Sequence, residues 1–225
     1  MKNIHIFIQC RIGSKRLPAK VFHTFFNIPI ILRMIKISKL IKFKKKYIYI
    51  ITDKKTFDFL KPIAQKEKIN LFCGPEKDVA QRYLRAIKSY SINLDDYILR
   101  LTADNYLIQP KILEKMIKLV SSSQCEYAYI EPLSHFAGEI FIVKIFLEKM
   151  LNGKISKFTK EHVTYDFRKR KNILKLDKNF MGINHAKKIT LDNIKDLIFL
   201  KNLELKFPDL KNIDSLNTIK KISNL

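Results

Sequence analysis

The sequence predicts an α/β fold in which a mostly parallel, Rossmann-like sheet is covered by helices on both faces. Three observations predict it. Short apolar runs with strand character recur along the chain, amphipathic segments of helical period separate most of them, and hydrophobic residues make up 47% of the 225 residues. Strands that alternate with single helices form βαβ units, whose parallel strands are buried on both faces.

The first half of the chain follows this alternation throughout. We expect buried strands at 4–9, 47–52, 69–73, 97–101 and 127–130. We expect helices between them at 29–40, 53–67, 78–89 and 110–120. Asp53 and Asp78 stand where a carboxylate can cap a helix, and Pro110 suits a first helical turn.

The second half is less regular. We expect a strand at 139–143, helices at 145–151 and 158–168, strands at 173–176 and 188–191, a last helix from 193 towards 205, and a short helix or frayed tail after 208. The chain contains no repeat, low-complexity linker or clear boundary. We therefore expect one domain over residues 1–225.

Composition excludes several classes of protein. Lys and Arg recur every few positions, so no apolar stretch approaches the roughly 20 residues that a membrane helix needs. The apolar run at 4–9 soon meets polar residues without a cleavage site, which indicates a first strand and not a signal peptide. Cys10, Cys73 and Cys125 are widely spaced, which argues against a disulfide framework or a zinc site and favours the reducing cytoplasm.

The net charge of +23 is spread along the chain, with its densest runs at 42–46 and 168–171. Such a charge attracts nucleic acid, membrane surfaces or polyphosphate substrates. A solvated Lys-rich surface is the favoured interpretation, and a nucleic-acid face is the less favoured one.

The connection after the first strand, Gln9 to Lys20, reads QCRIGSKRLPAK. It combines four cations, a hydroxyl and a glycine at the carboxyl end of a predicted strand, the edge at which open α/β sheets bind ligands. Backbone N–H groups together with Arg and Lys neutralise polyphosphate. The stretch lacks the Walker A pattern. A solvated basic turn is the alternative.

This stretch resembles the signature loop of the cytidylyltransferases, which include 3-deoxy-manno-octulosonate cytidylyltransferase, CMP-sialic acid synthetase and the spore-coat polysaccharide cytidylyltransferase-like family. Their loop is usually written Q-A-R-x-G-S-x-R-L-P-x-K, and only Cys10, in place of a small Ala, departs from it. Further segments resemble the family's motifs in the right order, at 51–53, 74–83, 100–108, 138–141, 160–164 and 189–197.

The resemblance implies a nucleotide-diphospho-sugar transferase (GT-A-like) architecture, with residues 1–131 as the nucleotide-binding half and 132–225 as the acceptor and dimerisation half. Members of the family are often dimers, so the resemblance admits a homodimer. The nucleotide-binding residues that it implies are Gln9, Arg11, Gly13, Ser14, Arg16, Lys20, Asp78, Arg82 and Thr102. Arg11, Lys20 and Asp104 are the implied catalytic residues.

A carboxylate just beyond a parallel strand and facing a phosphate loop suits a hard cation, so Asp104 is assigned to Mg²⁺, and the resemblance adds Asp192 as a second metal-facing carboxylate. Glu139, Glu161 and His162 fall on the acceptor side. Simpler roles remain open for several of these residues. The alternatives are a helix cap and surface ion pairing for Asp78 and Arg82, an exposed strand end for Asp104, a helix cap for Asp192 and a packed helix position for His162.

The resemblance implies transfer of CMP from CTP to a small acidic sugar or related acceptor, with pyrophosphate release, in surface polysaccharide or glycoconjugate biosynthesis. The choice of cytosine rests on the resemblance alone, and the acceptor is left open. A glycosyltransferase that uses a nucleotide-sugar donor and a basic nucleic-acid-binding protein are the alternatives. A degenerate family member is a third, because Ala103, Asn105, Tyr106 and Gln109 depart from the family's pattern.

Overall fold

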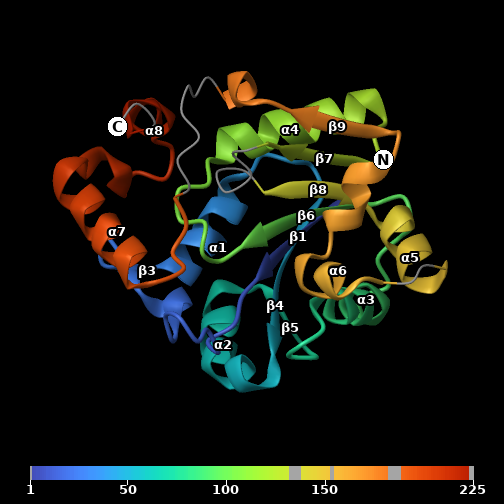
Figure 1. Cartoon of the computed structure of the whole chain (residues 1–225), viewed down its shortest axis with the longest axis horizontal. Coiled ribbons are helices and arrows are strands. Elements are labelled where there is room, and N and C mark those ends of the chain that lie inside the picture. Colours follow the sequence, from blue (N-terminus) through green and yellow to red (C-terminus); the bar gives the residue numbers. More distant parts are fainter. Residues whose placement is uncertain (1, 132–137, 153–154, 182–188, 223–225) are drawn as a thin grey trace.

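A computed structural model describes residues 2–131, 138–152, 155–181 and 189–222 of the chain. Over these residues, seven strands form one sheet in the order β5-β4-β1-β6-β8-β7-β9 (Figure 1). Their bounds are β1 Ile4–Gln9, β4 Lys46–Asp53, β5 Asn70–Gly74, β6 Tyr97–Thr102, β7 Tyr127–Ile130, β8 Glu139–Ile142 and β9 Ile173–Leu176. Only β8 runs antiparallel to its neighbours, β6 and β7, so the sheet is mostly parallel, as expected.

Helices cover the sheet in two groups (Figure 1). Their bounds are α1 Ile30–Leu40, α2 Lys54–Glu67, α3 Val79–Ser89, α4 Pro110–Ser123, α5 Val143–Asn152, α6 Lys157–His162, α7 Ile194–Lys206 and α8 Leu216–Ile222. Helices α1 and α4 pack against each other, whereas α3 packs with α5 and α6. Every residue from Ile4 to Ile8 in β1 is buried, which is the pattern of a central parallel strand. Among the described helices, none has the length and apolar character needed to cross a membrane.

The predicted helix starts are confirmed. The Asp53 carboxylate accepts from the backbone N–H of Thr56 at 3.0 Å and caps α2. The Asp78 carboxylate accepts from the backbone N–H of Gln81 at 2.9 Å and caps α3. Pro110 occupies the first turn of α4. Each satisfies or avoids an N–H group that the helix itself leaves without a partner.

The prediction of one continuous helix over 158–168 is wrong. Helix α6 ends at His162, the φ of 35° at the next residue, Val163, lies outside the helical region, and a separate 3-10 turn follows at Tyr165–Lys169. Tertiary contacts explain the break. Val163 is buried, and the Thr164 hydroxyl donates at 2.7 Å to the buried carboxylate of Glu139.

The prediction of a strand at 188–191 is also wrong within the described residues, while Lys188 lies outside them. Residues 189–191 join no strand, because the Leu191 N–H donates to the carbonyl of Asp104 at 3.0 Å. A hairpin of two antiparallel strands, β2 Thr24–Phe25 and β3 Ile28–Pro29, was not predicted. Each strand has two residues, which is too short to show the alternation of apolar and polar residues that marks a strand. The expected division after residue 131 falls beside residues that the structure does not describe.

Arg33 of α1 links the carboxyl-terminal segment to the loop after β6. Its guanidinium is fully buried and donates to the carbonyls of Tyr106 at 2.9 Å, Leu210 at 3.1 Å and Lys211 at 3.4 Å. Burial lowers the pKa of Arg33 to about 10, which leaves it charged at neutral pH. The loop after β6 and the residues that follow α7 are therefore held by one side chain.

A buried histidine, His5, lies at the opposite end of the sheet from these loops. His5 is buried, its ring nitrogens lie 3.1 Å from the Tyr49 hydroxyl and 3.2 Å from Asp96, and its ring stacks on Tyr47. Burial lowers the pKa of His5, and the neighbouring Asp96 only partly offsets that effect. The folded chain therefore favours neutral His5.

The unfolded chain binds a proton on His5 more readily than the folded chain does. Stability should consequently fall as the pH decreases through about 6.5, the pKa of an unfolded histidine. We expect urea denaturation midpoints to decrease from pH 7.5 to pH 5.5 and the His5→Gln variant to show a shallower decrease. The exposed-histidine variant His162→Gln is the control. An unchanged slope in His5→Gln would assign the pH dependence to another group.

Candidate active site

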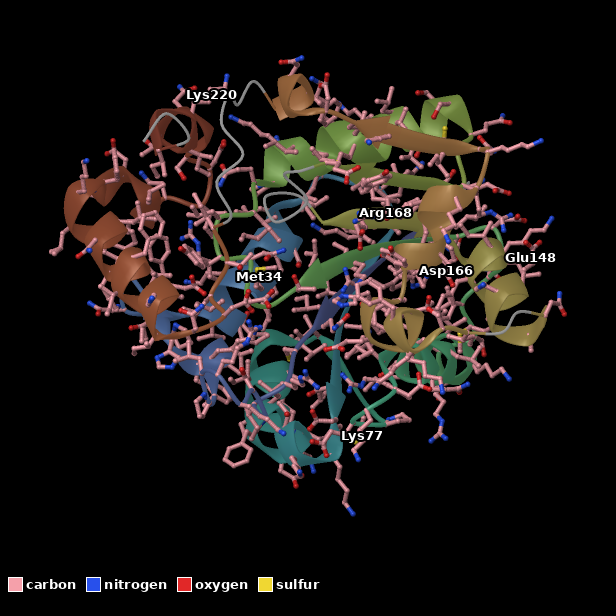
Figure 2. All side chains as sticks on the ribbon, viewed as in Figure 1. Met34, Lys77, Glu148, Asp166, Arg168 and Lys220 are labelled. Carbon is pink, nitrogen blue, oxygen red and sulfur yellow. The ribbon has the colours of Figure 1, made fainter. Side chains whose placement is uncertain are left out.

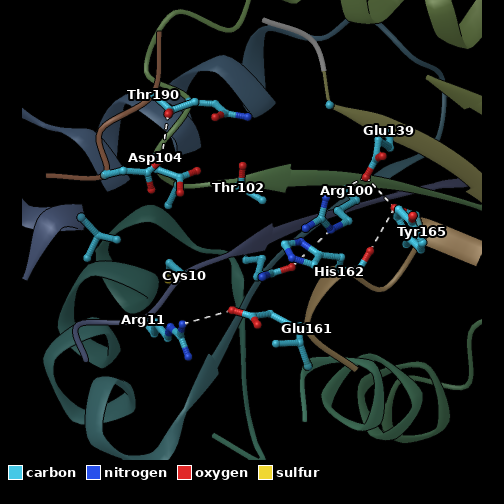
Figure 3. Close-up of a pocket in the computed structure, with 18 of the residues that line it drawn as sticks. Cys10, Arg11, Arg100, Thr102, Asp104, Glu139, Glu161, His162, Tyr165 and Thr190 are labelled. Carbon is cyan, nitrogen blue, oxygen red and sulfur yellow. Dashed lines mark hydrogen bonds and ion pairs between the residues drawn. The ribbon is translucent and has the colours of Figure 1, made fainter. Parts of the chain in front are cut away.

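A pocket of about 800 Å³ opens where β1 and β6 end (Figure 3). Register places Gln9 of β1 opposite Thr102 of β6, and the Ala103 N–H extends the pairing by donating to the Gln9 carbonyl at 3.0 Å. Loops that follow parallel strands meet at this edge. The predicted site residues that line the pocket are Gln9, Arg11, Arg16, Lys20, Arg82, Thr102, Asp104, Glu139, Glu161, His162 and Asp192.

Three predicted nucleotide-binding residues do not line the pocket. The Ser14 hydroxyl accepts from the Leu17 N–H at 3.4 Å within the loop, and Asp78 caps α3. Gly13 has only Glu76 near the position that a Cβ would occupy, at 3.8 Å, so the space beside it is open. The structure brings none of the three to the pocket wall.

The basic loop is held by its backbone. The Ile12 N–H donates to the Thr56 hydroxyl at 3.0 Å, and the Ala19 N–H donates to the Ile12 carbonyl at 3.0 Å. Ala19 adopts a left-handed conformation, with a φ of 51°, directly before the turn that begins at Lys20. Cys10 is buried, and burial raises its pKa to about 12, so it serves as a small packed residue and not as a thiolate.

Lys20 lies between the two predicted metal-facing carboxylates. Its ammonium is 2.6 Å from Asp104 Oδ2 and 3.3 Å from Asp192 Oδ1. The three side chains are 15%, 23% and 13% exposed, so the cluster is partly withdrawn from water. Arg16, which is 69% exposed, reaches Asp192 at 3.5 Å. Three segments remote in sequence thus meet in one charge cluster.

The backbone explains why Asp192 faces the pocket. Leu191 is bonded to the Asp104 carbonyl, and the Thr190 hydroxyl donates to Asp192 Oδ2 at 2.9 Å. Helix α7 is capped by Asn193 in a reciprocal capping box with Asp196. The alternative that Asp192 is the helix cap is therefore wrong.

The donor set of this cluster fits a hard divalent cation. Carboxylate oxygens are the ligands that Mg²⁺ takes from proteins, usually one or two of them, with the remainder from water and substrate phosphates. Lys20 shows that Asp104 and Asp192 can share one cation. Over the residues that the structure describes, no group of three or more His, Cys, Asp and Glu side chains could hold a metal. Substrate oxygens would have to complete the shell.

Glu139 forms the centre of the opposite wall. It is 4% exposed and lies beside Arg100 in the pocket (Figure 3). Its carboxylate accepts from Arg100 at 2.7 Å, Tyr127 at 2.8 Å and Thr164 at 2.7 Å. Burial alone would raise the pKa of Glu139, but Arg100 and the hydroxyl donors outweigh burial and lower it. The carboxylate is charged, and its oxygens are occupied by internal donors.

Arg168 and Arg100 are pocket residues that the sequence analysis did not single out for the site. Arg168 lines the pocket, lies 3.5 Å from Glu139 and over the ring of Tyr129, and has a side chain that is 34% exposed. Figure 2 shows Arg168 over the middle of the sheet, whereas Lys77 lies at the lower edge of the molecule in this view. Both arginines had a signal: Arg100 begins one of the matched motifs, and Arg168 begins a basic run.

Glycines allow two close approaches around the pocket. Gly138 has a φ of +89°, and a Cβ there would lie 2.5 Å from the Arg100 carbonyl, so only glycine lets β8 begin beside β6. A Cβ on Gly74 would lie 2.6 Å from Arg82 Cγ. Arg82 is buried and donates to the carbonyls of Pro75 and Glu76, so it holds this turn and is not a surface ion pair.

Helix α6 closes the pocket on the side of the basic loop. Glu161 forms an ion pair with Arg11 at 3.7 Å, and both side chains are exposed (Figure 3). His162 is exposed, and its ring lies 4.3 Å from the Phe158 ring with an angle of 35° between the two ring planes. Phe158 and Tyr165 line the pocket although they are 51% and 42% exposed, and the sequence analysis did not find them.

A mostly parallel α/β sheet that presents a basic loop and paired carboxylates at one edge is the architecture of an enzyme that binds a polyphosphate substrate. A family model described as cytidylyltransferase matches residues 5–212. The chain belongs to the cytidylyltransferase family and is a nucleotidyltransferase enzyme.

Individual relatives agree. The spore coat polysaccharide biosynthesis protein SpsF of Bacillus subtilis is 27% identical over 217 residues, 92% of this chain and 88% of that protein. A cytidylyltransferase from Leptospira borgpetersenii has a similar structure, with a TM-score of 0.81 and 26% identity over 98% of this chain and 94% of that one.

Two more distant structures share the fold. CMP:2-keto-3-deoxy-manno-octonic acid synthetase, complexed with CTP, has a TM-score of 0.68 at 12% identity, over 91% of this chain and 99% of that one. Rv0371c of Mycobacterium tuberculosis, in complex with manganese, has a TM-score of 0.63 at 10% identity, over 89% and 98%.

The carboxylate pair yields a direct prediction. If Asp104 holds the metal that accompanies the nucleotide, then the gain in CTP affinity that Mg²⁺ provides should fall by about 10- to 100-fold in Asp104→Asn, since a bond to a charged group contributes about 1.5 to 3 kcal/mol. Calorimetric titrations with and without Mg²⁺ measure this gain. Asp95→Asn, an exposed change just before β6, should behave as wild type. An undiminished Mg²⁺ effect in Asp104→Asn would remove this residue from the metal site.

Proposed function

We propose that the enzyme transfers CMP from CTP to a small acidic sugar or related acceptor and releases pyrophosphate, with Mg²⁺ as its metal. The observation that carries the proposal is the meeting of Lys20, Asp104 and Asp192 at the foot of the basic loop. The relative named for spore coat polysaccharide biosynthesis supports a role in making a surface polysaccharide or glycoconjugate.

The reaction is a displacement at the α-phosphorus of CTP. An acceptor oxygen forms a bond to this phosphorus, the bond to the bridging oxygen of pyrophosphate breaks, and the acceptor hydroxyl proton is released. Arg11, Arg16 and Lys20 line one side of the pocket, where they would neutralise the β- and γ-phosphates and the leaving pyrophosphate. Mg²⁺, when bound, would be held by Asp104 and Asp192 and would offset phosphate charge.

The two ends of the pocket contain cations from different parts of the chain. We propose that residues 1–131 bind the nucleotide and that residues 132–225 bind the acceptor, because the basic loop belongs to the first range and Arg168 to the second. We also assign the enzyme to the cytoplasm, since its three cysteines are free, as in proteins of a reducing compartment.

The charge of the acceptor wall favours an anionic acceptor. Arg100 and Arg168 both lie beside Glu139, which carries only one negative charge. Glu131 lies 3.8 Å from Arg168, but it forms its shorter ion pair with Lys175, at 2.9 Å. One positive charge is left over among these five groups, and a carboxylate or phosphonate would balance it.

Pyrophosphate release tests the proposed reaction. With Mg²⁺ and a panel of acidic sugars and phosphonates, we expect release from CTP with one class of acceptor and at most a few per cent of that rate from ATP, GTP or UTP. A coupled phosphate assay after pyrophosphatase treatment measures the rates. Equal release from UTP would contradict the choice of base, and the absence of nucleotide binding by calorimetry would overturn the proposed function.

Arg168 tests the acceptor wall. Replacing Arg168 with Gln should raise the KM for the acceptor by about 10- to 100-fold and leave the KM for CTP near the wild-type value, because a bond to a charged group contributes about 1.5 to 3 kcal/mol. Arg170→Gln removes the same charge two residues away, where the side chain contacts Glu126 and Glu148 outside the pocket. Equal effects of the two substitutions would indicate a general loss of charge and not an acceptor contact.

A further inference from the structure

Lys20 occupies the place between two carboxylates that a divalent cation would need. Its ammonium is hydrogen-bonded to Asp104 at 2.6 Å and also contacts Asp192 at 3.3 Å. None of the three side chains is more than 23% exposed, so solvent screens the cluster less than it screens a surface pair. The lysine is therefore a cation already bound at the metal position.

Two cations already face the carboxylates. Lys20 contacts both Asp104 and Asp192, and Arg16 contacts Asp192. A divalent ion that entered this arrangement would take carboxylate oxygens from Lys20 and would place two more positive charges beside its ammonium. Free metal should accordingly bind weakly to the enzyme alone.

A triphosphate changes these contacts. Lys20 and Arg16 belong to the same basic loop that faces the pocket, and the phosphate oxygens offer both cations new acceptors. A lysine ammonium on a flexible four-carbon stem can move between partners without movement of its backbone. Once Lys20 turns to the phosphates, its ammonium leaves the place between the two carboxylates, and a metal that the phosphates also bind can enter there.

We propose that Lys20 is a displaceable counter-ion that makes metal binding depend on the nucleotide. In the free enzyme Lys20 occupies the place between Asp104 and Asp192 and competes with the metal for them. When the nucleotide binds, Lys20 contacts its phosphates instead, and the metal can bind. By linkage, the metal raises nucleotide affinity by the same factor by which the nucleotide raises metal affinity. The inference rests on the proposed function only in taking CTP as the nucleotide.

Binding of Mn²⁺, a paramagnetic substitute for Mg²⁺, tests the proposal without any acceptor or turnover. Free Mn²⁺ is counted by electron paramagnetic resonance during titration of the nucleotide-free enzyme. We expect wild type to bind Mn²⁺ weakly and Lys20→Met to bind it at least about tenfold more tightly. Couplings between two binding sites typically change affinity by about 5- to 150-fold, and the expected gain lies within that range. Adding Asp192→Asn to Lys20→Met should abolish the gain, which would place the new metal at this cluster.

Matched variants separate this effect from a general loss of positive charge. Lys15→Met removes one exposed cation from the same loop and should leave Mn²⁺ binding as in wild type. Lys20→Gln repeats the main test with a different neutral side chain, in case Lys20→Met folds poorly by circular dichroism. If neither Lys20 variant gains affinity for Mn²⁺, or if Lys15→Met gains as much, the proposal is overturned.

The same titration with saturating CTP distinguishes this proposal from the proposed function. Using Mn²⁺ with CTP alone as the blank, we expect CTP to tighten Mn²⁺ binding at least about tenfold in wild type and much less in Lys20→Met. Equal CTP-induced tightening in both proteins would overturn the role of Lys20 and leave the proposed function standing. A failure of wild type to bind CTP at all, by calorimetry, would overturn the proposed function itself.

Discussion

The parallel pairing of β1 with β6 is the constraint on which the pocket depends. Six residues of each strand are in register, from Ile4 opposite Tyr97 to Gln9 opposite Thr102. Both strands are buried, and a slip of one residue would turn each side chain to the other face of the sheet. The basic loop that follows β1 and the carboxylate that follows β6 must therefore emerge side by side, and Lys20 then reaches Asp104.

Buried guanidinium groups secure the surroundings of this edge, each with a different set of acceptors. Arg33 donates to three carbonyls and Arg82 to two, so neither needs a carboxylate. Arg100 instead pairs with buried Glu139, and burial, which would lower its pKa, is outweighed by that carboxylate. Arginine suits these positions because its planar fork of donors satisfies several acceptors at once. Arg82 and Arg100, the two of these arginines that line the pocket, are thus each held by more than one acceptor.

The sequence was sufficient for the main strands and helices of the first half of the fold and for most of the charged residues that line the pocket. Apolar runs predicted β1, β4, β5 and β6. The motif after β1 predicted Lys20 as a site residue, and the motif after β6 predicted Asp104. Contacts between distant segments decided the rest. Strand β8 lies between β6 and β7 although β7 precedes it in the chain, and no local pattern encodes that insertion. Helix α6 ends at His162 because Thr164 bonds to Glu139, a tertiary contact that overrides the helical period.

The four departures from the family's pattern after β6 concern the packing beneath the pocket more than its charged face. Ala103 is buried, and its N–H continues the pairing with β1. Tyr106 is fully buried against Phe25, and its carbonyl accepts from Arg33.

Gln109 is buried as well, and its side-chain oxygen accepts from the Ser215 N–H at 3.1 Å, so it joins this loop to the start of α8. Two of the four residues, Ala103 and Asn105, line the pocket, and Asn105 is 8% exposed. The replacements are thus integrated into the fold through contacts with β1, Arg33 and the carboxyl-terminal segment. Asp104 contacts Lys20 in their midst, so the four replacements leave this carboxylate facing the basic loop.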